Sequence, residues 1–268
     1  ITPAADRALP ECPHFAACGG CHYQHLPYPR QIEVKQQILR ETLGRLGRLQ
    51  WAGAIHAHPS PPFGYRNRAQ WKIRLHDSRG AIGYFRSGSS ALLAVERCPI
   101  LSPGLQRVLA SLRALLSESR LPQTLREVEA FADDRDECLL LNASCTEFAG
   151  SPAALADTLR AALPGAASIL LHDSSRDRFQ LFGPGHITYR AAGAEFRVGH
   201  LSFFQINRHL VDHMAATVAQ QAAGARVLDV YAGVGLFSVP LARHCEKLVA
   251  VESNEAAVRD LQANLTPA

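Results

Sequence analysis

The chain has 268 residues, of which 47% are hydrophobic and 19% charged, and its formal net charge is +4. A chain this rich in apolar residues can bury a core, which excludes wholesale disorder, and its length suits about two domains. No apolar run approaches the roughly 18 residues of a membrane span and no signal peptide is recognisable, so we expect a cytoplasmic, monomeric protein without a membrane partner. The first residue is not Met, which suggests that Ile1 is not the start of the gene product.

Three of the seven cysteines lie within ten residues near the start of the chain, in a stretch rich in Cys, Pro, Gly and His. Clustered thiols in a chain without a secretion signal are more typical of metal ligands than of disulfides. Cys12, Cys18 and Cys21 form this group, and Cys98 could be a fourth ligand. Four thiolates can hold a 4Fe–4S cluster or a tetrahedral zinc ion. The division into three plus one favours the cluster, because zinc sites usually pair two short knuckles. The other thiols lie in apolar settings and are expected to be core residues: Cys138, Cys145 and Cys245.

An amphipathic helix and then a strand-rich region are predicted next. Apolar residues recur on one stripe between residues 30 and 46, which is typical of a helix. Between residues 65 and 100, apolar and polar residues alternate as they do in strands, and Gly83 and Gly88 mark the expected hairpins.

The strand-rich region is also the most basic part of the chain. Residues 61–100 include seven basic and two acidic residues. Their net charge is therefore +5, compared with +4 for the entire chain. Such a stripe indicates a polyanion binder, although a solvated strand face is the alternative. Aromatic residues within the stripe suit base stacking but also pack strands. The basic residues are Arg66, Arg68, Lys72, Arg74, Arg79, Arg86 and Arg97, and the acids are Asp77 and Glu96; we take Arg66, Arg68 and Lys72 as candidate RNA contacts.

The middle of the chain mixes helices and strands. Helices are predicted over residues 102–118 and 152–163, and strands over residues 128–131, 138–145, 168–172 and 178–182. This pattern predicts an α+β domain. We therefore divide the chain into an iron–sulfur loop with its helix over residues 1–55, a central α+β RNA-binding domain over residues 56–190, and a third part over residues 191–268.

The third part alternates strands and helices. A helix over residues 207–223 precedes apolar strands over residues 226–231 and 248–252, each followed by a helix, as in a parallel sheet covered on both faces. The expected fold class is therefore α/β together with α+β, ending in the first half of a class I, Rossmann-like domain.

A glycine-rich turn follows the first of these strands. Gly233 and Gly235 let the backbone approach a ligand closely, and Glu252, at the end of the second strand, can take both hydroxyls of a ribose. Asp229, four residues before Gly233, matches the D-x-x-x-G-x-G pattern of class I S-adenosylmethionine methyltransferases, whereas Ser238 departs from the dinucleotide fingerprint. The alternative is an ordinary tight turn without a ligand.

Four segments, in order along the chain, resemble bacterial RNA uracil-C5 methyltransferases of the iron–sulfur, 23S ribosomal RNA type. They are Cys12-Pro-His-Phe-Ala-Ala-Cys-Gly-Gly-Cys21, Glu96-Arg-Cys-Pro-Ile100, Ser202-Phe-Phe-Gln-Ile-Asn207 and Asp229-Val-Tyr-Ala-Gly-Val-Gly-Leu-Phe237. The resemblance implies that the four cysteines hold a 4Fe–4S cluster. It also implies that S-adenosylmethionine contacts Gln205, Tyr231 and Glu252. It puts Phe203 against the target base, where a core residue is the alternative.

The resemblance further implies a reaction. A cysteine thiolate adds to C6 of uracil, C5 takes the methyl group of S-adenosylmethionine, and a base removes the C5 proton from a uridine flipped out of its stack. The nucleophilic cysteine and the basic glutamate are expected beyond Ala268, so no catalytic residue is assigned within this chain, and the chain alone is expected to be inactive. The alternatives are a transfer RNA substrate, a non-catalytic zinc-stapled RNA-binding module, and a redox role for the cluster.

Overall fold

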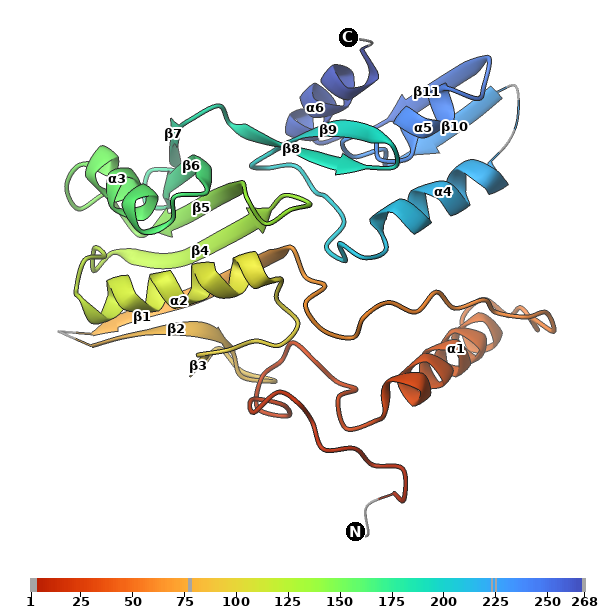
Figure 1. Cartoon of the computed structure of the whole chain (residues 1–268), viewed down its shortest axis with the longest axis horizontal. Helices are drawn as coiled ribbons and strands as arrows, with labels where there is room; N and C mark the ends of the chain where they lie inside the picture. Colours follow the sequence, from red (N-terminus) through yellow and green to blue (C-terminus); the bar gives the residue numbers. More distant parts are fainter. Residues whose placement is uncertain (1–3, 77–78, 223, 225, 267–268) are drawn as a thin grey trace.

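The structure is a computed structural model and describes residues 4–76, 79–222, 224 and 226–266. An N-terminal loop leads to a single helix, a seven-stranded sheet with two helices forms the middle of the molecule, and two small sheets with three helices complete it (Figure 1). No helix in these described ranges is both long and apolar enough to cross a membrane.

Helix α1 (Tyr28–Arg45) confirms the helix predicted over residues 30–46 to within two residues at its start. Pro27 and Pro29 fit its first turn, where backbone N–H groups need no partner within the helix. None of its residues is buried, and Ile38 and Leu39 are 42% and 46% exposed. The apolar stripe of this helix is therefore covered only in part by the segment that follows it.

The large sheet has the strand order β3-β2-β1-β4-β5-β6-β7. All neighbours are antiparallel except β5 and β6, which are parallel and are joined by a crossover through helix α3 (Pro152–Ala162). The strands are β1 (Arg68–His76), β2 (Arg79–Phe85), β3 (Leu92–Ala94), β4 (Leu125–Ala132), β5 (Leu139–Cys145), β6 (Ala166–Asp173) and β7 (Arg178–Phe182). The strands and helices predicted between residues 102 and 182 are thereby confirmed.

Helices α2 (Pro103–Ser117) and α3 (Pro152–Ala162) cover one face of this sheet and enclose the larger core. Ser102 begins α2 by accepting a hydrogen bond from the backbone N–H of Leu105, and Pro103 occupies the first helical position. Side chains alternate across each strand, so the remaining strand residues face the other side, which we call the open face. Residues of the open face that matter below are Lys72, Glu127, Asn142, Ser144, Ser168, His172 and Phe179.

Gly83 does not lie in a hairpin turn, so the prediction that it marks one was wrong. It lies within β2, and a Cβ atom built there would be 1.9 Å from the carbonyl oxygen of Leu93 in β3. A close approach of two strands requires this glycine. Gly88 does lie in a turn, with a φ of +68° that favours glycine.

The last part confirms the predicted alternation of strands and helices. It contains α4 (Val211–Gln221), β10 (Arg226–Val230), α5 (Ser238–Ala242), β11 (Lys247–Val251) and α6 (Glu255–Leu265), with β10 and β11 parallel. The hairpin of β8 (His186–Ala191) and β9 (Ala194–Gly199) was not predicted. Helix α4 begins later than residue 207, because the backbone of Asn207 and Arg208 pairs with Arg66 and Tyr65. Ala223, its predicted end, lies outside the described residues.

The middle sheet and the last part share a second core. Phe131 and Leu140, on the open face, pack with Tyr189, Phe196 and Phe204. The predicted division at residues 55 and 190 stays a prediction, since apolar contacts run across the second boundary.

The cysteines outside the proposed ligand set differ in burial. Cys145 is buried, as predicted, whereas Cys138 is exposed and Cys245 is intermediate. The prediction of a core position was wrong for Cys138, because this residue lies just before β5 begins, in the turn that follows β4.

His200 fastens the loop after β9 to the open face. It is 6% exposed, and its Nδ1 and Nε2 atoms lie 2.6 Å from Asn142 Oδ1 and 2.8 Å from Ser168 Oγ. Burial, and next the positive charge of Arg68, lowers the pKa of His200 to about 4. Between about pH 4 and pH 6.5, the imidazole of His200 is therefore neutral in the folded protein but protonated in the unfolded chain.

We expect the free energy of unfolding to decrease as the pH falls below about 6.5, by about 2 kcal/mol between about pH 7.5 and pH 5 from this group. The folded-state pKa lies below the unfolded one, so stability is present above the unfolded pKa and is lost on acidification. Urea unfolding at several pH values measures it. The same series on His200→Gln should show a weaker pH dependence, and an unchanged dependence would contradict the assignment.

Candidate functional site

The four cysteines predicted to be ligands line one cavity of about 590 Å³. The loop that carries Cys12, Cys18 and Cys21 is held on the end of β2, where Gly19 N–H donates to Phe85 O and Ser87 N–H donates to Ala17 O. Cys98 comes from the segment between β3 and α2, where its backbone N–H donates to Gln106 Oε1. Chain segments about eighty residues apart thus contribute thiols to the wall of one cavity, and their role as metal ligands stays a prediction.

The electrostatics of this cavity disfavour free thiolates. Burial raises the pKa of Cys98 to about 11. Burial also raises the pKa of Cys21, and its neighbours Cys12 and Cys18 raise it further. Thiols in such surroundings stay protonated at neutral pH until a metal centre takes the place of the proton. Within the described residues, no three His, Cys, Asp or Glu side chains converge closely enough to hold one metal ion.

The turn after β10 has an unusual backbone. Tyr231 has a φ of +64°, which non-glycine residues rarely adopt, and its side chain is 88% exposed. Gly233 and Gly235 also have positive φ values, 57° and 92°. A Cβ at Gly235 would lie 2.7 Å from Leu261 of α6, whereas one at Gly233 would meet nothing within 4 Å. Gly235 therefore serves close packing, and Gly233 leaves open space beside the turn.

Glu252 lies at the carboxyl end of β11, beside this turn. Its carboxylate accepts backbone hydrogen bonds from Gly233 (2.8 Å), Ser253 (2.7 Å) and Asn254 (2.8 Å). These N–H groups, Asn254 first, lower its pKa, so it is ionised at neutral pH. A carboxylate oxygen has lone pairs left after one such bond, and the group can still accept from a ligand hydroxyl.

Asp229, in β10, has a partner inside the fold. Ser238, the first residue of α5, donates its hydroxyl hydrogen to Asp229 Oδ2 at 2.6 Å. This bond closes the turn from strand to helix, which gives Asp229 a structural role in the glycine turn.

The segment from Leu201 to Phe204 alternates between exposed and buried side chains. Ser202 is buried and bonded to Asp260 of α6, and Phe204 lies in the second core. Phe203 is 62% exposed, so the alternative of a core residue was wrong. Gln205 follows, half-buried, and its carbonyl oxygen accepts from the Asn67 amide at 3.1 Å.

The three candidate RNA contacts do not form one free basic surface. Arg68 is largely buried: it donates to Ser202 O at 2.9 Å and lies over the ring of Phe131, which corrects its assignment to RNA. Lys72 is bonded to Glu127 of β4. Arg66 lines the cysteine cavity. Sequence counting missed the acids that β4 places opposite β1, and Asp77, counted within the stripe, lies outside the described residues.

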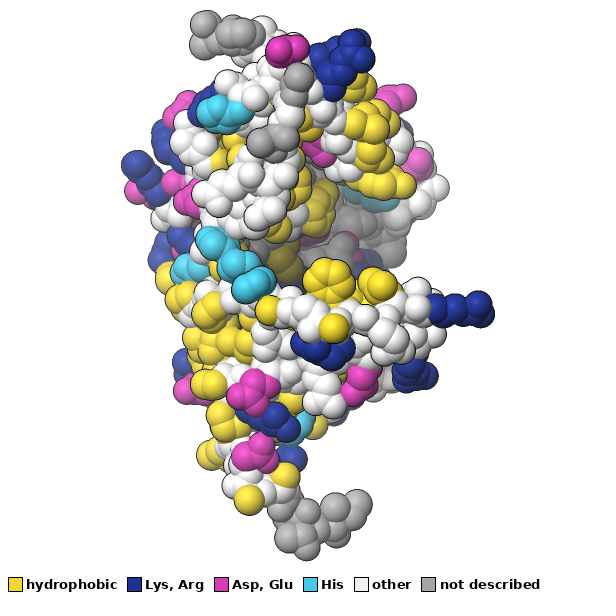
Figure 2. Space-filling model, turned by 90° about the vertical axis from the view of Figure 1, so that its right-hand side faces the viewer, with side chains coloured by type: hydrophobic (Ala, Val, Ile, Leu, Met, Phe, Trp, Pro, Cys, Tyr) yellow, Lys and Arg dark blue, Asp and Glu magenta, His cyan; other side chains and the backbone are white. Residues whose placement is uncertain are grey.

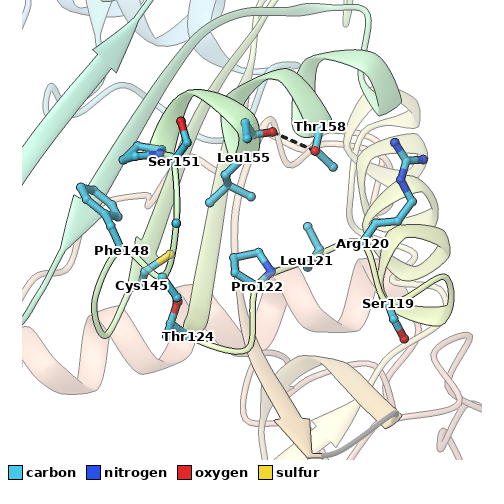
Figure 3. A pocket seen from close by; sticks show the side chains of 14 residues that line it. Ser119, Arg120, Leu121, Pro122, Thr124, Cys145, Phe148, Ser151, Leu155 and Thr158 are labelled. Atoms are coloured by element: carbon cyan, nitrogen blue, oxygen red, sulfur yellow. Dashed lines mark hydrogen bonds between the residues drawn. The ribbon is translucent and has the colours of Figure 1, made fainter.

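Two further hollows lie elsewhere. A cavity of about 320 Å³ between the end of α2, β5 and the start of α3 contains Arg120, Cys145 and Thr158 in its wall (Figure 3). On the side that carries α1 and α4, the surface is hollowed and histidines gather at the edge (Figure 2). A nitrogen of His58, which lines a cavity of about 580 Å³ beside α1, lies 2.6 Å from one of His213 in α4. None of the predicted cofactor residues lines the first cavity.

Comparisons with known proteins agree with this geometry. The family of the TRM5/TYW2 methyltransferase domain matches residues 189–267. The 23S rRNA (uracil(1939)-C(5))-methyltransferase RlmD of Alkalilimnicola ehrlichii is 32% identical over 270 residues, which cover 96% of this chain and 60% of that protein. The protein of the same name from Pseudomonas entomophila is 31% identical and is covered to 58%. The chain thus spans about three fifths of the length of the curated relatives it matches.

One solved structure extends the likeness to the fold. The tRNA (uracil-54, C5)-methyltransferase of Pyrococcus abyssi, solved with S-adenosyl-L-homocysteine, has a TM-score of 0.76. The match covers 99% of this chain and 64% of that one at 23% identity, and therefore shows the fold alone. Over almost all of its length, the chain is thus similar in sequence to proteins named as RNA uracil-C5 methyltransferases.

Proposed function

We propose that the protein containing this chain methylates C5 of a uridine in RNA, with S-adenosylmethionine as the methyl donor. Ribosomal RNA is the proposed substrate, and the cytoplasm is the proposed location, because the relatives of 30% identity or more carry the name of 23S rRNA methyltransferases. The observation that carries the proposal is that α6 holds both parts of the candidate site. It binds Ser202, next to the exposed ring of Phe203, and its Leu261 packs against Gly235 of the turn that Glu252 adjoins.

The cofactor site would be built on the carboxyl ends of β10 and β11, where ligands bind in open parallel sheets. Glu252 would accept from the ribose hydroxyls, while Tyr231 and Gln205 would contact the remainder of the molecule. The open space at Gly233 suits a close backbone approach. When S-adenosylmethionine is bound there, it supplies an electrophilic methyl group. Phe203 would hold the target base by stacking on its face.

The cysteine cavity suits a 4Fe–4S cluster better than a zinc ion. Zinc needs four thiolates within about 2.3 Å of one point, whereas in a cluster each cysteine binds a different iron. The four thiols line one cavity of about 590 Å³ without converging on a point among the described side chains. Cys12, Cys18, Cys21 and Cys98 would hold the cluster. Its role would be structural, because methyl transfer moves no net electrons.

Glu252→Ala should weaken S-adenosylmethionine binding by about 1–3 kcal/mol, because a hydrogen bond to a charged acceptor is lost. Isothermal titration of the intact protein measures it. Glu246→Ala is the matched control, since Glu246 is exposed at the opposite end of β11. Equal affinity of the Glu252 variant and the wild type would remove Glu252 from the site.

Anaerobic purification should give a brown protein with about four irons and four sulfides per chain. Cys98→Ser should lose iron, and Cys138→Ser should keep it, because Cys138 is exposed and lies outside the cavity wall. A colourless protein with one zinc ion would support the alternative of a zinc-stapled module.

Residues 1–268 alone should not transfer a methyl group to RNA. Cys245 precedes β11, so the length of that strand, about 16 Å, separates it from Glu252. Cys138 and Cys145 belong to the middle sheet. The test incubates labelled S-adenosylmethionine with unmodified ribosomal RNA and, in parallel, transfer RNA.

Label in 5-methyluridine from this chain alone would show that one of its own thiols is the nucleophile. With the intact protein, label in ribosomal RNA is expected. Label in transfer RNA alone would show that transfer RNA, and not ribosomal RNA, is the substrate.

A further inference from the structure

An aromatic pair lies on the open face at the edge of the large sheet. His172 of β6 and Phe179 of β7 are directly opposite each other, with ring centroids 4.3 Å apart and planes 7° from parallel. β7 is the last strand of the sheet, and Phe179 is 50% exposed. The pair is therefore a two-ring stack whose outer ring is accessible.

Hydrogen bonds fix the inner ring of this stack. His172 Nε2 lies 3.0 Å from Asp177 Oδ1, and its Nδ1 lies 3.4 Å from Ser144 Oγ in β5. A ring held at both nitrogens cannot rotate freely, so the plane of Phe179 above it is set in advance. Because the ring of Phe179 is already oriented, stacking of a flat ligand on it would cost the protein little side-chain entropy.

The pair lies on the same surface as the loop that carries Phe203. His200, at the start of that loop, is bonded to Asn142 and Ser168, which share the open face with Ser144 and His172. His172 follows Ser168 by four positions along β6, a distance of about 13 Å. An unpaired RNA strand spans this distance in a few nucleotides.

The small apolar area beside the pair favours a nucleic acid over a protein partner. Arg176 and Arg178 do not add charge next to the stack, because both bind the buried carboxylate of Asp173, which pairs with Cys145 on the helix-covered face. The neighbouring acid Asp177 is bonded to His172, and Glu127 to Lys72. The exposed apolar side chains here, Phe179 and Leu181, offer far less than the roughly 800 Å² per partner of a stable protein interface.

We propose that Phe179, backed by His172, is a stacking site for an unpaired base of the substrate RNA, a few nucleotides from the target uridine. Every base has a π-face, so this site adds affinity and positions the strand without reading its sequence. The inference rests on the proposed function, because it takes RNA as the substrate.

The test uses a single-stranded RNA of about a dozen nucleotides containing 2-aminopurine, whose fluorescence is quenched by stacking. Phe179→Ala should weaken binding by about five- to a hundredfold and abolish the quenching at the position nearest the pair, while Phe179→Tyr retains both. The slope of log affinity against log salt should stay unchanged, because stacking releases no counterions from phosphates.

Trp51→Ala is the matched control, since Trp51 is 47% exposed and follows α1, which lies far from β7 (Figure 1). If Phe179→Ala lowers the melting temperature, Phe179→Leu keeps an apolar side chain on the strand and takes its place. Wild-type affinity in Phe179→Leu or Phe179→Ala would overturn the stacking site but leave the proposed methylation standing. Absence of RNA binding by the wild-type chain would overturn the stacking site. The proposed methylation would still be tested separately, by the transfer of labelled methyl groups to RNA. Capture of a β-strand peptide on the edge of β7 without RNA binding would likewise overturn it.

Discussion

Asn67 is the residue on which the arrangement of the molecule most depends. It is fully buried, yet its side chain donates to the hydroxyl of Tyr189 and to the carbonyl of Gln205, while its backbone pairs with Ile206 and Ala132. A buried amide costs free energy unless such bonds are made, so these partners are fixed relative to one another. The neighbouring Arg66 and Arg68 extend the connection to the cysteine cavity and to Ser202. One short segment therefore holds the cysteine cavity, the sheet and the loop of Gln205 in register.

The two proposed sites solve opposite electrostatic problems. At the turn after β10, backbone N–H groups surround the carboxylate of Glu252 and keep it ionised in a half-exposed place. In the cysteine cavity, burial raises the pKa of Cys98 and Cys21 and keeps these two thiols neutral. The first site is thus charged before any ligand arrives, whereas the second would acquire thiolate charges only together with the proposed metal.

Features encoded in a few adjacent residues could be predicted from sequence, whereas those that depend on distant neighbours could not. The turn of Gly233 and Gly235 and the strands around it follow from local pattern, and so does the gathering of Cys12, Cys18 and Cys21. The neutralisation of Lys72 by Glu127 depends on strand pairing across 55 residues, and no local charge count reveals it. Gly83 looked like a turn residue because its reason, the approach of Leu93, lies on another strand. Phe203 and Phe204 are identical in sequence terms, and only packing distinguishes the exposed ring from the buried one.

Helix α1 differs from every other helix of the described chain in having no buried residue. Local stability within a protein follows the density of buried apolar contacts, so segments with few of them open more often than the core does. The amide hydrogens of α1 would then exchange with solvent through small, local openings, whereas those of β4 and β5 would exchange only through global unfolding. The chain therefore has an order of opening, in which a helix tied at one end to the cysteine loop loosens long before the sheet that supports it.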